Sequence, residues 1–394
     1  IDEGLYDHEF CERWVSQLDE LAAAVEGVTL DVVAERCQLD PDDVLAATRM
    51  FAAGPRGTAG TGTGPNMAAH SSLTEHLVVV LNTILGRVNR EGDLIENGLL
   101  LYPDMPHRAQ VVPPRNPTNG PPSRIRNLRG YRGEMPTAAL AEEILEPGEG
   151  RIRALIVSGG NPVVAFPDQE LTMRALEDLE LLVVIDYRMT ATAEFADYVI
   201  APTLALERAD VPHLMDRWFR QPYTNYTDPV VERDGDVLNE WEVFWELASR
   251  LGSTLPLPGG SPEMTERPGT DEIIDRAYAG SRMPLDEVRA NRRVVHPDMR
   301  PVVAPAEEGA TARFTPAPDD LMAELAAFLD EPYPMLGDVD VSAYPFRLVS
   351  RRLKHVLNST GTELPALARK GTTNPAYMHP DDVAELGLEA GLVR

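Results

Sequence analysis

Apolar residues recur at helical spacing near the start of the chain. After Asp7, a residue type that favours helix N-caps, they stand three or four positions apart at Phe10, Trp14, Leu18 and Leu21. This spacing predicts one amphipathic helix. A second helix is predicted over Pro41–Ala53, where the proline occupies a permitted first position.

A glycine-rich turn follows the second helix. Arg56–Ala59 is strand-like in composition and runs into Gly60–Asn66. Ser72 and Glu75 then stand at capping-box spacing before the apolar run Leu77–Leu85. A strand, a glycine turn and a helix in this order predict a Rossmann-like α/β domain over residues 1–98.

A β-α-β-α-β pattern occupies residues 151–202. The predicted strands are Ala154–Val157, Leu181–Ile185 and Tyr198–Ile200, and the helices between them are Asp168–Leu179 and Ala191–Ala196. The wholly apolar second strand is typical of a parallel sheet buried on both faces. The pattern therefore favours a doubly wound, mostly parallel sheet, in a second α/β domain over residues 99–335 that also holds proline-rich loops.

The end of the chain changes character. Pro301–Pro318 has the composition of a linker, and a helix is predicted at Leu321–Leu329. Phe346–Ser350 begins a strand-rich segment, and His379–Leu388 is a predicted small helix. We expect a third domain over residues 336–394.

The net charge and the apolar runs of the chain exclude some classes of binding partner. Its 394 residues carry a net charge of -27, which repels phosphate backbones, so nucleic acid is not an expected partner. No apolar run is long enough to span a membrane, and no signal peptide is evident, so we expect a cytoplasmic protein. The two cysteines, Cys11 and Cys37, are too few for a cluster and are expected to be buried structural thiols.

The turn Ser158–Pro162 is the sharpest candidate site. It follows a predicted buried strand, and ligands of open α/β sheets bind beyond the carboxyl ends of strands. Asp186 ends the next strand, where dinucleotide sites place an acid. A tight turn without a ligand, and a capping or ion-paired aspartate, remain alternatives. The glycine spacing differs from Gly-x-Gly-x-x-Gly, which counts against an ordinary NAD site.

A basic run at Ser350–Thr360 is unusual in so acidic a chain. Arginine, lysine, histidine and amide side chains lie close together in it, a mixture suited to phosphate and heterocycle binding. A solvated cationic turn is the alternative.

Taken in order, several stretches resemble the molybdopterin oxidoreductase family of formate dehydrogenases, dimethyl sulfoxide reductase and periplasmic nitrate reductases. They are Gly4–Phe10, Gly60–Asn66, Leu81–Arg87, Arg90–Gly92, Gly159–Pro162, Ile185–Asp186, Glu194–Pro202, Ser350–Ser359 and Pro380–Gly391. The resemblance implies a bis(molybdopterin guanine dinucleotide) cofactor with molybdenum or tungsten. It also implies that residues 336–394 start a C-terminal cofactor-binding β-barrel.

The resemblance further implies three groups of cofactor-binding residues. They are Gly62, Gly64 and Asn66 at one pterin dinucleotide; Gly160, Asn161 and Asp186 at the guanosine and pyrophosphate of the other; and Arg351, Lys354, His355 and Asn358 from the barrel. No catalytic or metal-ligating residue is assigned in this chain.

The chain also departs from the family pattern. Family members usually begin with a cysteine-rich [4Fe–4S] segment and supply a Cys, selenocysteine or Ser ligand to the metal, and neither has a counterpart here. The chain starts at Ile1 and stops at Arg394, early in the barrel. We therefore expect an internal fragment that is inactive by itself, with the cluster and the metal ligand outside it.

The implied reaction is a two-electron oxidation or reduction at the metal. Formate is the favoured small-molecule substrate, and a separate electron-transfer partner is expected. Two alternatives stay open: a cofactor-free electron-transfer scaffold in a respiratory complex, and an NAD dehydrogenase on a Rossmann fold.

Overall fold

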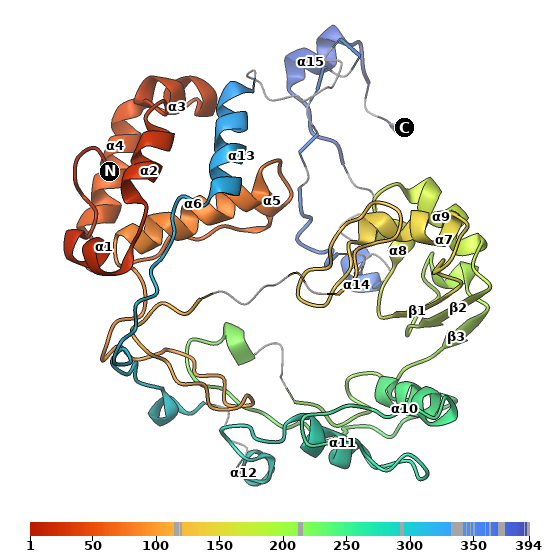
Figure 1. The fold of residues 1–394 in the computed structure, drawn as a ribbon. Coiled ribbons are helices and arrows are strands. Elements are labelled where there is room, and N and C mark those ends of the chain that lie inside the picture. The colour runs from red at the N-terminus through yellow and green to blue at the C-terminus, as the bar shows by residue number, and fades with distance from the viewer. Residues whose placement is uncertain are drawn as a thin grey trace. The chain divides into compact units, whose positions relative to one another are not determined.

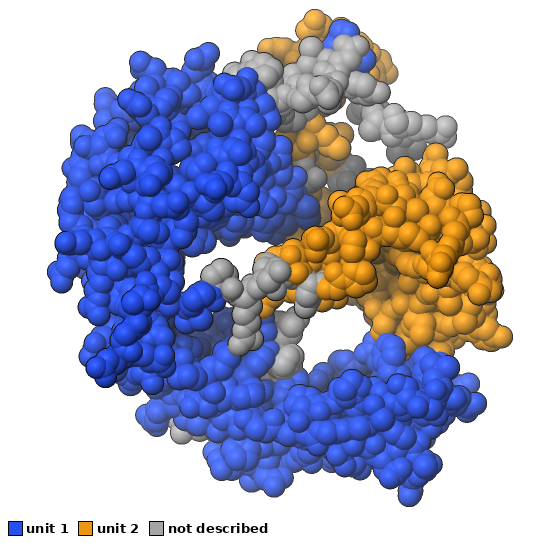
Figure 2. Space-filling view, viewed as in Figure 1, with its two compact units in different colours: residues 1–117, 203–344 blue, residues 118–202, 345–394 orange. Residues whose placement is uncertain are grey.

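The computed structural model describes two compact units. Unit 1 comprises residues 1–117 and 203–344, and unit 2 comprises residues 118–202 and 345–394 (Figure 2). The described residues are all of 1–394 except 114–117, 119, 212–215, 292–294, 332–341, 344, 347, 350, 359, 362–363, 369–374, 390 and 392–394. The three domains expected from the sequence stay a prediction.

The N-terminal part of unit 1 is helical (Figure 1). Its helices are α1 (His8–Trp14), α2 (Leu18–Val25), α3 (Leu30–Cys37), α4 (Pro41–Ala53), α5 (Thr63–Asn66), α6 (Ser71–Ile84) and, from later in the chain, α13 (Asp319–Asp330). The core beneath them is formed by Cys11, Val15, Leu21, Val80, Ile84 and Ala317. Helix α4 has the predicted bounds, and the Asp7 side chain caps α1 by accepting from the Phe10 amide.

The single helix predicted through Leu21 is two helices. The Ser16 amide donates to the Phe314 carbonyl at 2.8 Å, and the Phe314 amide donates to the Trp14 carbonyl at 2.7 Å. This pairing draws the backbone out of the helix after Trp14. Gln17 then takes a left-handed conformation before α2 begins.

The strand predicted at Arg56–Ala59 does not form. The side chain of Asn82, on α6, accepts from the Ala59 amide at 2.7 Å and donates to the Ala59 carbonyl at 2.8 Å. These bonds satisfy both backbone groups of Ala59, the last residue of the predicted strand. Residues 1–98 are all described and contain helices but no strand, so the Rossmann-like domain expected there is not confirmed.

The capping box predicted before α6 is also wrong. The helix begins at Ser71 after His70, and Glu75 accepts a hydrogen bond from Thr61 in the glycine turn. Glu75 therefore fastens the turn to the helix instead of closing the helix end.

The remainder of unit 1 contains α10 (Glu240–Arg250), α11 (Thr270–Ala277), α12 (Leu285–Ala290) and the 3-10 turns η3 (Asp216–Trp218) and η4 (Pro297–Met299). Pro301–Pro318 is not a linker. Val303 in it is 1% exposed, Val302 pairs with Leu94, and Phe314 pairs with Val15. Local composition cannot reveal these partners because they lie more than 200 positions away.

Unit 2 holds a three-stranded parallel sheet. Its elements are η1 (Thr137–Ala139), α7 (Leu140–Leu145), β1 (Ala154–Ser158), α8 (Pro162–Ala165), α9 (Gln169–Glu177), β2 (Leu181–Ile185), η2 (Ala193–Phe195) and β3 (Tyr198–Ile200). The strands lie in the order β1-β2-β3. A core of Val157, Val163, Leu176, Leu182, Val184 and Ala193 packs between sheet and helices. The parallel sheet is confirmed. A doubly wound sheet reverses its strand order at one point, and the three described strands show no such reversal, so double winding is not confirmed.

The described residues of 345–394 form two short helices, α14 (Pro365–Ala368) and α15 (Pro380–Glu385), and a bridge between Leu357 and Thr360. Residues 346, 348 and 349 are not in a strand, and 347 and 350 lie outside the described residues. The expected barrel is therefore not confirmed. Across the described part of the chain, no helix has the length and apolarity needed to cross a membrane.

Candidate functional site

The carboxyl ends of β1 and β2 bring two predicted site segments together. Ser158 is the register partner of Ile185, and the Gly159 amide donates to the Ile185 carbonyl at 2.9 Å. The Asp186 amide in turn donates to Ile200 of β3 at 3.2 Å. The glycine turn after β1 and the acid after β2 therefore lie side by side at one edge of the sheet, as strand ends of a parallel sheet do.

The backbone conformation requires glycine at one position of this turn but not at the other. Gly159 has a φ of +61°, a conformation that strains other residues, so the fold itself favours glycine there. At Gly160, an added Cβ would meet Val157 Cγ1 only at an ordinary 3.5 Å. The chain alone would thus accept alanine at Gly160.

Asn161 serves the fold as well as the candidate site. Its Oδ1 accepts from the Thr192 hydroxyl at 2.8 Å and from the Thr192 amide at 3.2 Å. The Thr192 hydroxyl accepts from the Val163 amide at 3.1 Å, and Thr192 is fully buried. Asn161 therefore anchors the turn, and sequence reasoning missed its partner because an isolated threonine carries no spacing signal.

Asp186 is a buried carboxylate, 8% exposed, directly after β2. Its Oδ1 accepts from the Arg188 amide at 3.0 Å, which holds the side chain in a local turn. A carboxylate offers about four acceptor sites, so this bond leaves capacity for donors on a ligand.

The glycine turn of unit 1 is open to its surroundings. A Cβ added at Gly60, Gly62 or Gly64 would meet no atom within 4 Å, and none of the three has a positive φ. Asn66 ends the short helix α5 and is exposed. Nothing within the described chain requires these glycines, and the space around them leaves the backbone open to a group outside the chain.

The basic segment forms a turn in unit 2. The Arg351 guanidinium lies 4.7 Å from the centre of the Tyr377 ring, and Arg352 donates to Asn358 Oδ1 at 3.2 Å. Lys354 is exposed and His355 half-buried on the same turn. Of the expected ligand-binding residues, Arg351, His355 and Asn358 thus already have partners within the chain.

The structure therefore collects the site residues into groups. Gly160, Asn161 and Asp186 meet at one sheet edge, and Arg351, Lys354, His355 and Asn358 share one turn, both in unit 2. Gly62, Gly64 and Asn66 belong to unit 1. Among the described residues, no three His, Cys, Asp or Glu side chains gather as metal ligands would.

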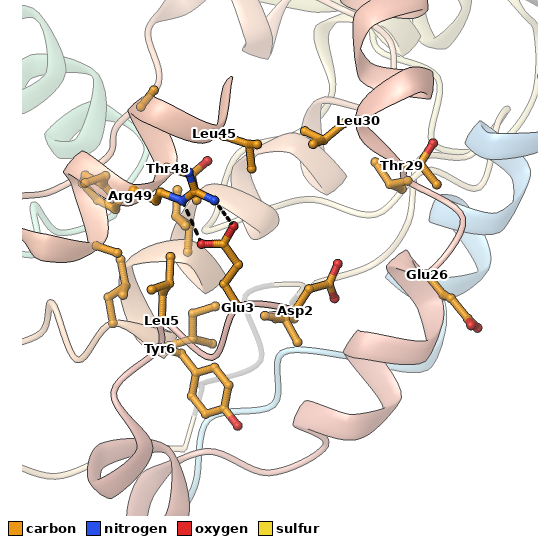
Figure 3. A pocket seen from close by; sticks show the side chains of 18 of the residues that line it. Asp2, Glu3, Leu5, Tyr6, Glu26, Thr29, Leu30, Leu45, Thr48 and Arg49 are labelled. Carbon is orange, nitrogen blue, oxygen red and sulfur yellow. Dashed lines mark hydrogen bonds and ion pairs between the residues drawn. The ribbon is translucent and has the colours of Figure 1, made fainter. Parts of the chain in front are cut away.

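A large hollow in unit 1 lies apart from the residues predicted to bind the cofactor (Figure 3). Its volume is about 790 Å³. It is lined by residues near the start of the chain, by the loop before α3, and by parts of α3, α4 and the end of α6. Leu5, Leu30 and Leu45 supply apolar wall, and Arg49 forms an ion pair with Glu3 at 2.6 Å. The hydrogen bond from Arg49 lowers the pKa of the Glu3 carboxyl.

Comparisons with known proteins confirm the family that the sequence resembles. Residues 48–250 match the family model for molybdopterin oxidoreductase. The thiosulfate reductase molybdopterin-containing subunit of Salmonella typhimurium is 22% identical, over 99% of this chain and 55% of that protein. Formate dehydrogenase H of Escherichia coli is 24% identical, over 64% of this chain and 36% of that protein.

The fold is shared with a solved structure. Acetylene hydratase from Pelobacter acetylenicus aligns with a TM-score of 0.70 and 21% identity, over 99% of this chain and 57% of that chain. The chain thus spans about half of the length of the thiosulfate reductase subunit and of acetylene hydratase.

Proposed function

Because this chain belongs to the molybdopterin oxidoreductase family, we propose that it supplies part of the binding surface for a bis(molybdopterin guanine dinucleotide) cofactor with molybdenum or tungsten. When bound, such a cofactor supplies two-electron oxidation or reduction at its metal. The residues of this chain hold and orient the nucleotide ends.

The observation that carries the proposal is the sheet edge of unit 2. Gly160 lets a pyrophosphate approach the backbone, because its Cα carries no side chain. Asp186 lies beside it, and its carboxylate can accept from the N1–H and the exocyclic amine of guanine, two donors spaced for one carboxylate. Asn161 keeps the turn in place through Thr192.

Two further groups support the same ligand. The open glycines Gly62 and Gly64, with Asn66, fit the close approach of a second dinucleotide in unit 1. Lys354 and His355, with Arg351 and Asn358 on the same turn, supply donors suited to phosphate oxygens. Each dinucleotide carries two negative charges on its pyrophosphate, which explains why a basic segment occurs in so acidic a chain.

We propose formate as the substrate of the whole protein, with a separate electron-transfer partner, a [4Fe–4S] cluster outside these residues and a cytoplasmic location. A second candidate is reduction of a sulfur oxyanion such as thiosulfate. It is favoured by the extent of the match, since the thiosulfate reductase subunit aligns with 99% of this chain and formate dehydrogenase H with 64%.

The test uses variants of the full-length protein. Asp186→Asn keeps an acceptor for the Arg188 amide but removes the negative charge, and Gly160→Ala adds a methyl group that the chain itself can accommodate. We expect both to lower the metal and pterin content about tenfold while the melting temperature stays near that of the wild type. Metal analysis and pterin fluorescence measure the content.

The matched control is Asp286→Asn, whose side chain is 98% exposed, and it should leave the cofactor content unchanged. Wild-type cofactor content in both site variants would overturn the proposal. A full-length protein free of metal and pterin would favour the scaffold alternative, and saturable quenching of NADH fluorescence would favour the dehydrogenase. Turnover with formate compared with thiosulfate separates the two substrates.

A further inference from the structure

A second hollow in unit 1, of about 360 Å³, brings together three arginines from different segments. Arg13 comes from α1, Arg90 from the turn after α6, and Arg108 from an extended segment. We call this hollow the arginine pocket. Phe10, Phe314 and Glu91 also line it. No residue of the glycine turns or of the basic turn takes part.

Backbone hydrogen bonds fix the walls of the arginine pocket. Phe314 is joined to α1 through the Trp14 carbonyl at 2.7 Å, and the Ala109 amide donates to the Ala304 carbonyl at 2.9 Å. The Ala304 amide donates back to His107 at 2.8 Å. The segments that carry the arginines therefore keep their places without a ligand, and preorganisation lowers the cost of binding.

Arg13 and Arg90 each contact a neighbouring group and still have N–H donors available for a ligand. The Arg13 guanidinium lies 4.7 Å from the centre of the Trp14 ring, and no ion pair or hydrogen bond joins it to another described residue. Arg90 donates to the Gly86 carbonyl at 3.0 Å and to Asp7 at 3.2 Å. A guanidinium has five N–H donors. Arg13 keeps all of them, and Arg90, whose Nε also donates to Gly86 at 3.1 Å, keeps the two on Nη1.

The third cation is held in a similar way. Arg108 donates to the Pro305 carbonyl at 3.2 Å and pairs with Glu307 at 3.2 Å. Gln110, another lining residue, accepts from the Glu307 amide at 2.6 Å through its Oε1, so both N–H donors of its side-chain amide remain. The arginine pocket is thus rich in donors, and Glu91 is its one acidic lining residue among those described.

We propose that the arginine pocket binds a small organic oxyanion, a carboxylate or a phosphate, with its apolar body against Phe10 and Phe314. Guanidinium groups match the geometry of both anions and are retained in partly apolar surroundings more readily than ammonium groups. The volume lies within the roughly 300–1,000 Å³ of small-ligand sites. The Glu91 carboxylate repels negative charge at its end of the pocket. The anionic group of the ligand is therefore expected to face the arginines.

Isothermal titration of the 394-residue chain tests this site without any cofactor. One arm uses inorganic phosphate and the other butyrate, both at constant ionic strength, with choline chloride as the cationic control. We expect saturable one-to-one binding in one arm, with a Kd on the order of 1 mM. Binding of phosphate alone identifies a phosphate ligand, and binding of butyrate alone identifies a carboxylate ligand. Binding in neither arm overturns the proposal.

Three variants separate the arginine pocket from general charge effects. Arg13→Gln should weaken binding about tenfold, because it removes a charged donor. Arg250→Gln, at an exposed position on α10, should bind as the wild type does. Glu91→Gln should strengthen binding several-fold, a gain that misfolding cannot produce. Unchanged affinity in both Arg13→Gln and Glu91→Gln would exclude the site.

Discussion

At the scale of single residues, the two cysteines differ in burial, and this difference should set how readily each thiol reacts. Cys11 is buried under α6, and its thiol donates to the Ile84 carbonyl at 3.3 Å. Burial, with a smaller contribution from Asp7, raises the pKa of Cys11 to about 11. Cys37, at the end of α3, is exposed, so the expectation of two buried thiols is confirmed only for Cys11.

The native protein should therefore be alkylated at one cysteine only. At pH 8 about one thousandth of Cys11 is thiolate, and the thiolate is the nucleophile. We expect iodoacetamide to modify Cys37 and spare Cys11, as measured by peptide mass spectrometry. Alkylation in denaturant, where both react, is the control. Equal labelling of the two in the native state would show that Cys11 is not buried as described.

At the scale of elements, His70 fastens α6 to α13. Its Nδ1 lies 3.0 Å from Glu324 and its Nε2 2.9 Å from Glu331, and its ring meets Phe328 edge-on at 5.5 Å. Hydrogen bonds to Glu331 and then Glu324 raise the pKa of His70. Both ring nitrogens can donate only when the histidine is protonated, so the contact is strongest in that state.

The contribution of His70 to stability should depend on pH. Because its pKa is raised in the folded state, the contribution is complete below the unfolded value near 6.5 and disappears as the pH rises through the folded value. We expect His70→Gln to lower the free energy of unfolding by on the order of 1 kcal/mol at pH 5.5 and by much less at pH 9. Urea unfolding at several pH values measures this, and a difference independent of pH would refute it.

At the scale of the whole molecule, charge dominates. The chain carries 63 acidic and 36 basic residues, and many of its arginines are engaged with carboxylates, as in the pairs Arg233–Glu242 and Arg289–Asp275. Little positive surface is then left to attract a polyanion. The basic turn and the arginine pocket are local exceptions, suited to small anions.

We therefore expect the chain to pass through a heparin column at pH 7 and 0.1 M salt and to bind an anion exchanger under the same conditions. The reason is repulsion between the net charge of -27 and the sulfate groups of heparin. Elution position measures both. Retention on heparin that salt weakens would reveal a larger cationic surface than the structure describes.

The sequence by itself determined the elements whose signal is local. Helix α4 and strands β2 and β3 have the predicted bounds, because a complete apolar run or an amphipathic period between clear end signals specifies them. The sequence also placed Gly160 and Asp186 correctly at one edge of the sheet. Each follows a strand, and the ends of neighbouring parallel strands lie side by side. The order of the motifs, more than any one of them, indicated the family.

Only the tertiary structure decided features that depend on distant partners. Arg56–Ala59 is strand-like in composition, yet both backbone groups of Ala59 bond the Asn82 side chain. Pro301–Pro318 has a linker's composition but pairs with Leu94 and Val15. The arginine pocket likewise assembles Arg13, Arg90 and Arg108 from separate segments. Such contacts depend on which segments fold against one another, and no local period of apolar and polar residues encodes that.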